Sequence, residues 1–429
     1  MQHKIVYAGI ASRSFAQASV TLERLAELSV GAKQVERLTE GIGDERVAER
    51  DAAVAAFAAL PFVEKFVAPP GVTPPELAVV MTDGGRLQIR DPAPTTEATR
   101  GPNDGAAAGS VPATASVATA PDWEEEEPPK KGHWREDKVG LLLAMTSTAS
   151  AADPCPDIPA AFLDVVRIPK LVRQLKKNAR AGEDAVVTTD DPEAVEAALS
   201  AEADYTPPAV QTRQVVASRS RWPAFAPLLA TAAWALGFQG ASRKAFVGDG
   251  SANNWRLQRR FFGSFVPILD FIHALSYVFA AALAGRTFAA GWACYRQWIR
   301  WVWQGKVGEV IAALRQRQGE LGLPGSASAE TSPAQVVSQA LAYLENQRDK
   351  MKYDAYRQAG LPITSSLMES TVKQINQRVK GSEKFWSEAG SEAVLQLRAD
   401  QLSDGAILEA FWDRRQAEAT GQRRYHRSA

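Results

Sequence analysis

Three short apolar runs that each end in an aspartate constrain the fold of this chain more than any other feature. The runs cover residues 77–83, 244–249 and 265–270, and residues 138–145 form a fourth apolar run. Runs of this length, rich in Val, Ile, Leu and Phe, are typical of buried strands. Helical patterns separate the later runs, so the sequence predicts an α/β fold built on a buried sheet.

Two glycines, Gly84 and Gly85, directly follow the first apolar run, and an alternating run covers residues 86–90. Two short strands around a Gly-Gly turn predict a β-hairpin. With residues 138–145 as a third strand this hairpin becomes a meander. Residues 244–249 and 265–270 follow as the fourth and fifth strands, so the sequence predicts a mixed five-stranded sheet flanked by helices.

Apolar residues at helical spacing predict the rest of the regular structure. Helices are expected within 11–60, at 160–178, 222–237, 253–262 and 367–380, and in a long helical region from His273 to about Arg357 that is broken at Gly305 and at 323–325. Residues 181–220 carry no clear pattern and receive no assignment.

Residues 92–131 are dominated by Pro, Ala, Thr and Gly and close with an acidic run at 124–127. This composition predicts a disordered insertion, and the acidic run fits a solvated tether better than a site. The chain then divides into a helical N-terminal region (1–76), a first core part (77–273), an all-helical insertion (274–359) and a last core part with a tail (360–429). The N-terminal region is expected to be either a plain helical bundle or a DNA-binding domain.

Composition limits the class of protein. Lys and Arg number 49, as do Asp and Glu, so a nucleic-acid binder of this composition has to gather its basic side chains on one face. Cys155 and Cys294 lie far apart, which argues against a disulfide scaffold and a cysteine zinc site. The first residues lack the pattern of a signal peptide, and the apolar stretch 266–284 contains Asp270 and His273. We therefore expect a reduced, cytoplasmic protein without a membrane span.

Three carboxylates stand out as candidate metal ligands: Asp83, Asp249 and Glu369. Carboxylate oxygens are the ligands that Mg²⁺ prefers, and pairs of such ions catalyse phosphoryl transfer. Each residue also has a structural alternative. Asp83 fits a turn aspartate, Asp249 fits a helix N-cap, and Glu369 fits a capping box that begins at Ser366.

The predicted helix 367–380 carries a polar stripe, which contains Glu369, Lys373, Asn376 and Lys380. This stripe lies apart from the helix's apolar face. A carboxylate and lysines on one stripe suit a site in which the carboxylate meets metal while the lysines meet DNA phosphates.

Several blocks of the sequence together resemble the signature of Kra-type insertion-sequence transposases, which are bacterial relatives of the Mutator-like DDE transposases. The blocks are 82–85, 133–140, 247–250, 268–274, 368–370, 378–386, 397–399 and 411–415. The similarity spans about residues 78–415, interrupted by the low-complexity insertion and by a weak stretch from about 147 to 220. The order and variety of the blocks make it specific, whereas no single block would.

The resemblance implies an RNase H-like fold with Asp83, Asp249 and Glu369 as catalytic and metal-binding residues. It also implies an auxiliary Asp-x-x-His element, formed here by Asp270 and His273; the alternative for His273 is a histidine that only caps or packs its helix. Two departures stand out. Ser276-Tyr277 replaces a Glu-His pair, and Gly250 leads into 251–255, where relatives tend to carry Ala and an aromatic residue.

The implied activity is DNA transposition with two divalent metal ions, Mg²⁺ or Mn²⁺ as a substitute. The implied partners are double-stranded DNA, as terminal inverted repeats and target, and a second copy of the chain in a homodimer or larger synapse. Basic and aromatic side chains near the site are expected to contact this DNA; they are Lys373, Arg378, Lys380 and Lys384, with Trp255 or Trp386 stacked on a base. The alternatives are a structure-specific nuclease without strand transfer and a domesticated or inactive DNA-binding derivative.

Overall fold

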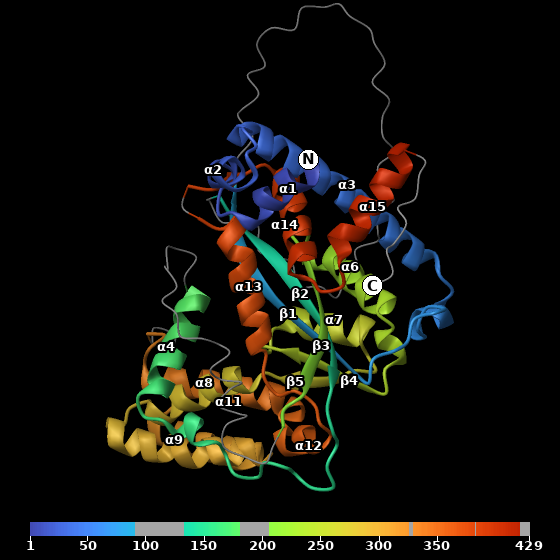
Figure 1. Cartoon of the computed structure of the whole chain (residues 1–429). Coiled ribbons are helices and arrows are strands. Elements are labelled where there is room, and N and C mark those ends of the chain that lie inside the picture. Colours follow the sequence, from blue (N-terminus) through green and yellow to red (C-terminus); the bar gives the residue numbers. More distant parts are fainter. Residues whose placement is uncertain (91–132, 181–205, 326–328, 382, 421–429) are drawn as a thin grey trace, which may run out of the picture.

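A computed structural model of the chain describes residues 1–90, 133–180, 206–325, 329–381 and 383–420. The predicted low-complexity insertion and its acidic run lie outside these residues. One mixed sheet forms the centre of the molecule, with helices on both sides of it (Figure 1). The predicted mixed α/β class with a sheet flanked by helices is confirmed.

The sheet has the strand order β3-β2-β1-β4-β5. Its strands are β1 (Leu77–Ile89), β2 (Trp134–Thr146), β3 (Ala209–Ser218), β4 (Arg243–Gly248) and β5 (Val266–Leu269), and β6 (Phe385–Trp386) adds a short pairing to the end of β1. β1, β2 and β3 pair antiparallel, whereas β4 is parallel to β1 and β5 is parallel to β4. The sheet is therefore antiparallel on one side of β1 and parallel on the other.

The predicted hairpin at Gly84 and Gly85 is wrong. β1 runs straight through both glycines and pairs with β2 from Leu77 to Gln88 without a break. Gly85 lies opposite Asp137 of β2, and a Cβ atom at Gly85 would stand 2.6 Å from that carboxylate. A glycine occupies position 85 because a larger residue would collide with the neighbouring Asp137 carboxylate. It does not mark a turn.

β3 lies in the segment that received no assignment from the sequence. It occupies one edge of the sheet, and its first half, including Gln211 and Thr212, is largely exposed. An exposed edge strand needs few apolar residues on its outer half, so its sequence lacks the strand pattern. Five main strands were predicted and the described residues form five, but β3 replaces the second half of the supposed hairpin.

Helices cover both faces of the sheet. α6 (Trp222–Ala235) and α7 (Ala252–Phe261) alternate with β3, β4 and β5, and α13 (Ser366–Val379) packs against β1. Leu229 of α6 lies against Gly140 of β2, whereas Asn376 of α13 lies against Gly85, the partner of Asp137. Asp137 and Gly140 are three residues apart on one strand and so face opposite sides. α6 and α13 therefore lie on opposite faces.

The predicted helical region 273–357 is divided into α8 (Phe271–Leu283), α9 (Phe288–Trp303), α10 (Val307–Leu321), α11 (Pro333–Gln347) and α12 (Tyr353–Gln358). The expected breaks at Gly305 and 323–325 are present, and a further break lies at Gly285, which has a φ of 66°. α4 (Arg167–Arg180) starts later than predicted, after a 3-10 turn at Ala160–Leu163. Other 3-10 turns are Phe62–Phe66, Phe238–Gly240 and Arg348–Lys350.

The stretch 266–284 forms β5 and α8, as predicted, in place of a membrane span. Within the described ranges no helix combines the length and the apolar character that crossing a bilayer requires. The described cysteines, Cys155 and Cys294, are both free thiols.

The N-terminal region forms α1 (Gln2–Ala11), α2 (Phe15–Ala26) and the long α3 (Ala32–Ala59), which lie beside α14 (Glu388–Leu402) and α15 (Ile407–Thr420) at the far end of the chain (Figure 1). A small apolar cluster joins these helices and contains Val6, Ile10, Ile42, Leu397, Leu408 and Phe411. The two ends of the chain thus form one helical layer.

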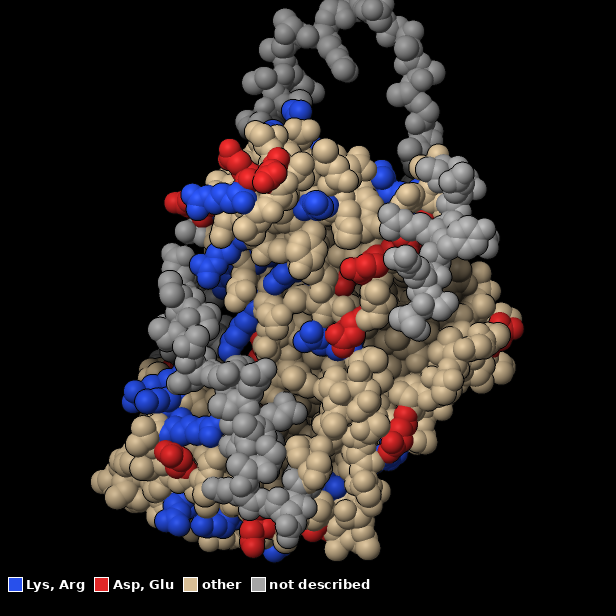
Figure 2. Space-filling model, in the orientation of Figure 1, with Lys and Arg blue, Asp and Glu red and all other residues tan. Residues whose placement is uncertain are grey.

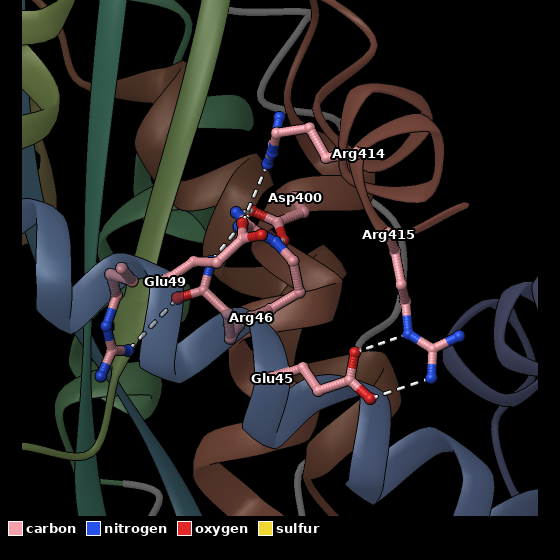
Figure 3. A network of polar contacts seen from close by, with 8 residues as sticks. Glu45, Arg46, Glu49, Asp400, Arg414 and Arg415 are labelled. Carbon is pink, nitrogen blue, oxygen red and sulfur yellow. Dashed lines mark hydrogen bonds and ion pairs between the residues drawn. The ribbon is translucent and has the colours of Figure 1, made fainter. Parts of the chain in front are cut away.

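Ion pairs add to this layer (Figure 3). Arg46 of α3 donates from Nε to Asp400 of α14 at 2.9 Å, and both side chains are buried. Arg415 of α15 pairs with Glu45 at 2.6 Å, but those two side chains are 35% and 45% exposed. Solvent screens exposed pairs strongly, so the buried pair is the one expected to matter for stability.

Replacing Asp400 by Ala is expected to lower the free energy of unfolding by about 3 kcal/mol, because it leaves the Arg46 guanidinium buried without its main partner. Urea denaturation measures this loss. Glu45→Ala removes the exposed partner of Arg415 and is the matched control, with an expected loss below about 1 kcal/mol. Equal losses in the two variants would contradict the assigned role of the buried pair.

Candidate active site

The candidate carboxylates Asp83, Asp249 and Glu369 come from separate elements that approach one edge of the sheet. The parallel pairing of β1 with β4 ends at Met81 and Val247, and each aspartate lies two residues further along the chain. The two aspartates therefore lie side by side where β4 ends, although β1 itself continues beyond Asp83 to Ile89. Glu369 lies in the first turn of α13, which packs against β1. All three side chains are partly buried.

The pKa values indicate that these carboxylates interact with one another. Burial raises the pKa of Asp83 to about 7, and the negative charges of Asp249 and, more weakly, Glu369 act in the same direction. The Gly84 N–H donates to Asp83 at 2.7 Å and opposes this rise without cancelling it. Burial also raises the pKa of Glu369. Like charges in a partly desolvated region favour the binding of protons or of cations.

Asp249 is held by a hydrogen-bond network at the start of α7. Its Oδ1 accepts from the Ser251 N–H and from Asn254 Nδ2, each at 2.9 Å. The buried Asn254 also accepts from Thr82 Oγ1 at 2.7 Å and so ties the middle of β1 to the turn that follows β4. Ser251, not Asp249, is the N-cap of α7. Asn254 is a site residue that no sequence pattern marked, since a lone helical Asn has no characteristic spacing.

Asp270 connects two helices at the same edge. It is the N-cap of α8, and its Oδ1 accepts from the N–H groups of Ile272 and Ser365, each at 3.2 Å. Its Oδ2 lies 2.6 Å from His273 Nδ1. Because Ser365 directly precedes α13, the buried Asp270 links the Asp-x-x-His element to the helix that carries Glu369.

His273 brings a positive charge to this acidic cluster. Burial lowers the pKa of His273, but the hydrogen bond with Asp270 and the charges of Asp270, Asp249 and Glu369 outweigh it and raise the pKa to about 9. The imidazole is therefore protonated at neutral pH. The predicted pair Asp270 and His273 thus lies beside Asp83, Asp249 and Glu369.

The capping-box alternative for Glu369 is not formed. α13 begins at Ser366, and the preceding Ser365 makes no side-chain capping hydrogen bond. A capping box needs its Glu at the third helical position, whereas Glu369 is the fourth. Asp270, instead of Glu369, accepts a hydrogen bond at the start of α13, from the Ser365 N–H. Glu369 therefore does not have the capping role that the sequence offered as an alternative.

The candidate DNA contacts fall into two groups. Lys373 and Lys380 lie partly exposed on the polar stripe of α13, and Lys380 Nζ stands 5.7 Å from the centre of the Trp134 ring. Lys384 donates to the carbonyl groups of Gln377 and Arg378, each at 3.1 Å, at the end of α13. Burial lowers the pKa of Lys384 to about 8, so its ammonium is less available to a phosphate than the other two.

Contrary to the expectation from the sequence, Arg378, Trp386 and Trp255 are buried. Arg378 donates from Nε to the Gly9 carbonyl group at 2.8 Å and packs 4.4 Å from the Phe15 ring centre. Burial lowers its pKa to about 10. These three side chains join the helical layers to the core, so none of them presents a surface to DNA.

The chemistry of the donors suits a hard divalent cation, since Asp83, Asp249 and Glu369 offer carboxylate oxygens. In the described part of the chain, no three His, Cys, Asp or Glu side chains form a ready-made metal group. The mutual repulsion that contributes to the raised pKa of Asp83 is the charge that a divalent cation would neutralise.

A comparison of the chain with known protein families finds no match, and none is found among curated proteins. The interpretation of the site therefore depends on its own residues and on their arrangement.

Proposed function

We propose that the chain is a metal-dependent DNA transposase of the DDE type, which cuts DNA at the ends of an element and joins them to a target. Asp83, Asp249 and Glu369 are the proposed catalytic carboxylates. The observation that carries this proposal is their arrangement: Asp83 and Asp249 each lie two residues beyond the last parallel pair of β1 and β4, and Glu369 lies in the first turn of α13, which packs against β1.

The sheet supports an RNase H-like core, which is the fold that the sequence resemblance implies. Three antiparallel strands lead into two parallel ones in the order β3-β2-β1-β4-β5. The first acidic residue lies on the central β1, the second follows the neighbouring β4, and the third lies on a helix against β1. An all-helical insertion lies between β5 and α13.

The proposed chemistry is an in-line displacement at phosphorus. Two Mg²⁺ ions held by the three carboxylates would activate the attacking oxygen and stabilise the leaving oxygen. His273 keeps its proton through the hydrogen bond with Asp270 and places a positive charge beside the carboxylates. Asn254 orients the Asp249 carboxylate.

The distribution of charge also supports a nucleic-acid substrate. The chain is neutral overall, yet Figure 2 shows Lys and Arg side chains gathered down the left of the visible face, over α13 and toward the insertion. Lys373 lies on this helix, and Lys380 is its C-terminal cap residue. Basic side chains beside the acidic site would attract the DNA phosphates and so allow a DNA strand to approach the carboxylates.

The test uses the full chain with Mg²⁺ or Mn²⁺ and labelled DNA that carries the sequences flanking its gene. Transposition predicts cleavage at the repeat ends and covalently joined products. Cleavage without joining would instead indicate a structure-specific nuclease. Binding without any cleavage would reject both enzymatic functions and favour a domesticated derivative.

A further inference from the structure

The turn that carries Asp249 is held from outside the sheet, by α11 of the insertion. Tyr343 donates its hydroxyl hydrogen to the Asp249 carbonyl oxygen at 2.7 Å. Gln347 donates from Nε2 to the next carbonyl oxygen, that of Gly250, at 3.1 Å. Tyr343 and Gln347 are four residues apart and so lie on one face of α11. Two successive carbonyl groups of one turn are thus bound by a single helix.

Gly250 is adapted to this contact. Its φ of 97° lies in a region that other residues rarely adopt. A Cβ atom built on Gly250 would stand 2.8 Å from the Tyr343 hydroxyl oxygen. The absence of a side chain therefore allows Tyr343 to reach the backbone of the turn.

Tyr343 is itself held by the helix that carries the Asp-x-x-His element. Its ring stacks on Tyr277 of α8, with ring centres 3.8 Å apart and an interplanar angle of 11°. Tyr277 follows His273 by one helical turn, so the two side chains project from the same face of α8. α8 therefore carries both the Asp-x-x-His element and the ring on which Tyr343 stacks, and Tyr343 in turn donates to the Asp249 turn.

We propose that Tyr343 and Gln347 are positioning residues for the candidate active site. They hold the Asp249 turn at the position where its carboxylate lies beside Asp83. The packing of the helical insertion against the sheet therefore controls the geometry of the carboxylates. The inference about catalysis rests on the proposed function. The inference about geometry does not, because both hydrogen bonds and the stacked rings exist whatever the site binds.

The first test measures the geometry alone. The Ser251 N–H donates to the Asp249 carboxylate, so its hydrogen exchange reports how well the carboxylate is held. Tyr343→Phe keeps the stacked ring and removes the hydroxyl. We expect peptides that contain residues 249–254 to exchange about fivefold faster in this variant, the effect of losing one hydrogen bond.

Tyr356→Phe is the matched control, because the Tyr356 hydroxyl also donates to a strand carbonyl, that of Pro267 in β5, at 3.2 Å. This variant is expected to leave exchange at residues 249–254 unchanged while its melting temperature falls to a similar extent. Unchanged exchange at residues 249–254 in Tyr343→Phe, or an equal rise in both variants, would overturn the positioning role.

The second test measures catalysis in full-length protein. Tyr343→Phe and Gln347→Met are expected to raise the Mg²⁺ concentration for half-maximal DNA cleavage by roughly tenfold, as loss of outer-shell partners does elsewhere. The KM for DNA should stay the same, and Tyr356→Phe should match the native protein. A rise in the KM for DNA with an unchanged Mg²⁺ requirement would overturn the assignment. If the native protein cuts no DNA, the proposed function fails, and the exchange result alone decides on the positioning role.

Discussion

Replacing Asp249 by Asn is expected to abolish DNA cleavage and joining, with a loss of about 10²–10³-fold or more, the order seen when one group that stabilises transition-state charge is removed. The amide keeps an oxygen that accepts from Ser251 and Asn254, so the fold should survive. It removes the negative charge that is needed to bind a divalent cation. Gel analysis of end-labelled DNA in Mg²⁺ measures the rate.

Asp164→Asn is the matched control for this variant. The Asp164 Oδ1 likewise accepts from backbone N–H groups two and three residues ahead, those of Val166 and Arg167, at 2.7 and 2.8 Å. It lies before α4, outside the carboxylate cluster, and its replacement should leave the rate unchanged. Asp249→Asn protein that keeps more than a tenth of the native rate with a native melting temperature would exclude Asp249 as a metal ligand in the reaction.

Replacing Asp137 by Asn is expected to stabilise the protein at alkaline pH. Asp137 is fully buried on β2, and neither of its carboxylate oxygens accepts a hydrogen bond from another described residue. Burial raises the pKa of Asp137 to about 7, and Glu136 adds to this rise, whereas Lys138 and Lys380 oppose it. The buried amide oxygen of Asn376 stands near the same point above Gly85. An amide at position 137 supplies a donor to Asn376 that does not titrate.

The unfolding free energy of the native protein should fall as the pH rises, because Asp137 binds a proton more tightly in the folded than in the unfolded chain. A carboxyl whose pKa is higher in the folded than in the unfolded chain stabilises the fold fully below its unfolded pKa, and that contribution is lost as the pH rises through its folded pKa. Between pH 4 and pH 8.5 the native protein should therefore lose up to about 4 kcal/mol from this group, at about 1.4 kcal/mol per pKa unit. The difference in unfolding free energy between Asp137→Asn and native protein should grow by this amount, measured by urea denaturation across that range.

Glu23 of α2 provides the control, because it is an exposed carboxylate far from Asp137 in the sequence. Glu23→Gln should change the unfolding free energy by less than about 0.5 kcal/mol, with no growth of the difference between pH 4 and pH 8.5. A difference between Asp137→Asn and native protein that stays constant from pH 4 to pH 8.5 would show that Asp137 does not hold a proton in the folded state.

Local patterns in the sequence were sufficient for the main elements. The apolar run that ends at Asp249 is the inner strand β4, which needs apolar residues on both faces. The run that ends at Asp270 is the edge strand β5, of which Ile268 and Leu269 are buried. The helix that carries Glu369 was placed within one residue of its observed limits. Local patterns alone left each candidate carboxylate with a structural alternative, and Asp83, Asp249 and Glu369 were selected as one set by the resemblance of the surrounding blocks.

Contacts between distant residues decided what the sequence left open or misassigned. Gly84 and Gly85 look like a turn by themselves, but pairing with β2 makes them part of a continuous strand, and Asp137 and Asn376 occupy the space where a side chain at position 85 would lie. Arg378 looks like a DNA contact, but Gly9 and Phe15, more than 360 residues away, bury it.

The hydrogen bond from α11 to the Asp249 turn is another contact between residues that are distant in the sequence. Tyr343 and Asp249 are 94 residues apart in the sequence, and neither flanking pattern differs from that of an ordinary helix or strand. The spacing of apolar residues shows which face of a helix or strand is buried. It does not show which side chain from elsewhere in the chain packs on that face. The sequence by itself therefore determined most of the helices, the buried strands and the candidate carboxylates, whereas only the tertiary structure decided the edge strand β3, the continuity of β1 and what holds the Asp249 turn in place.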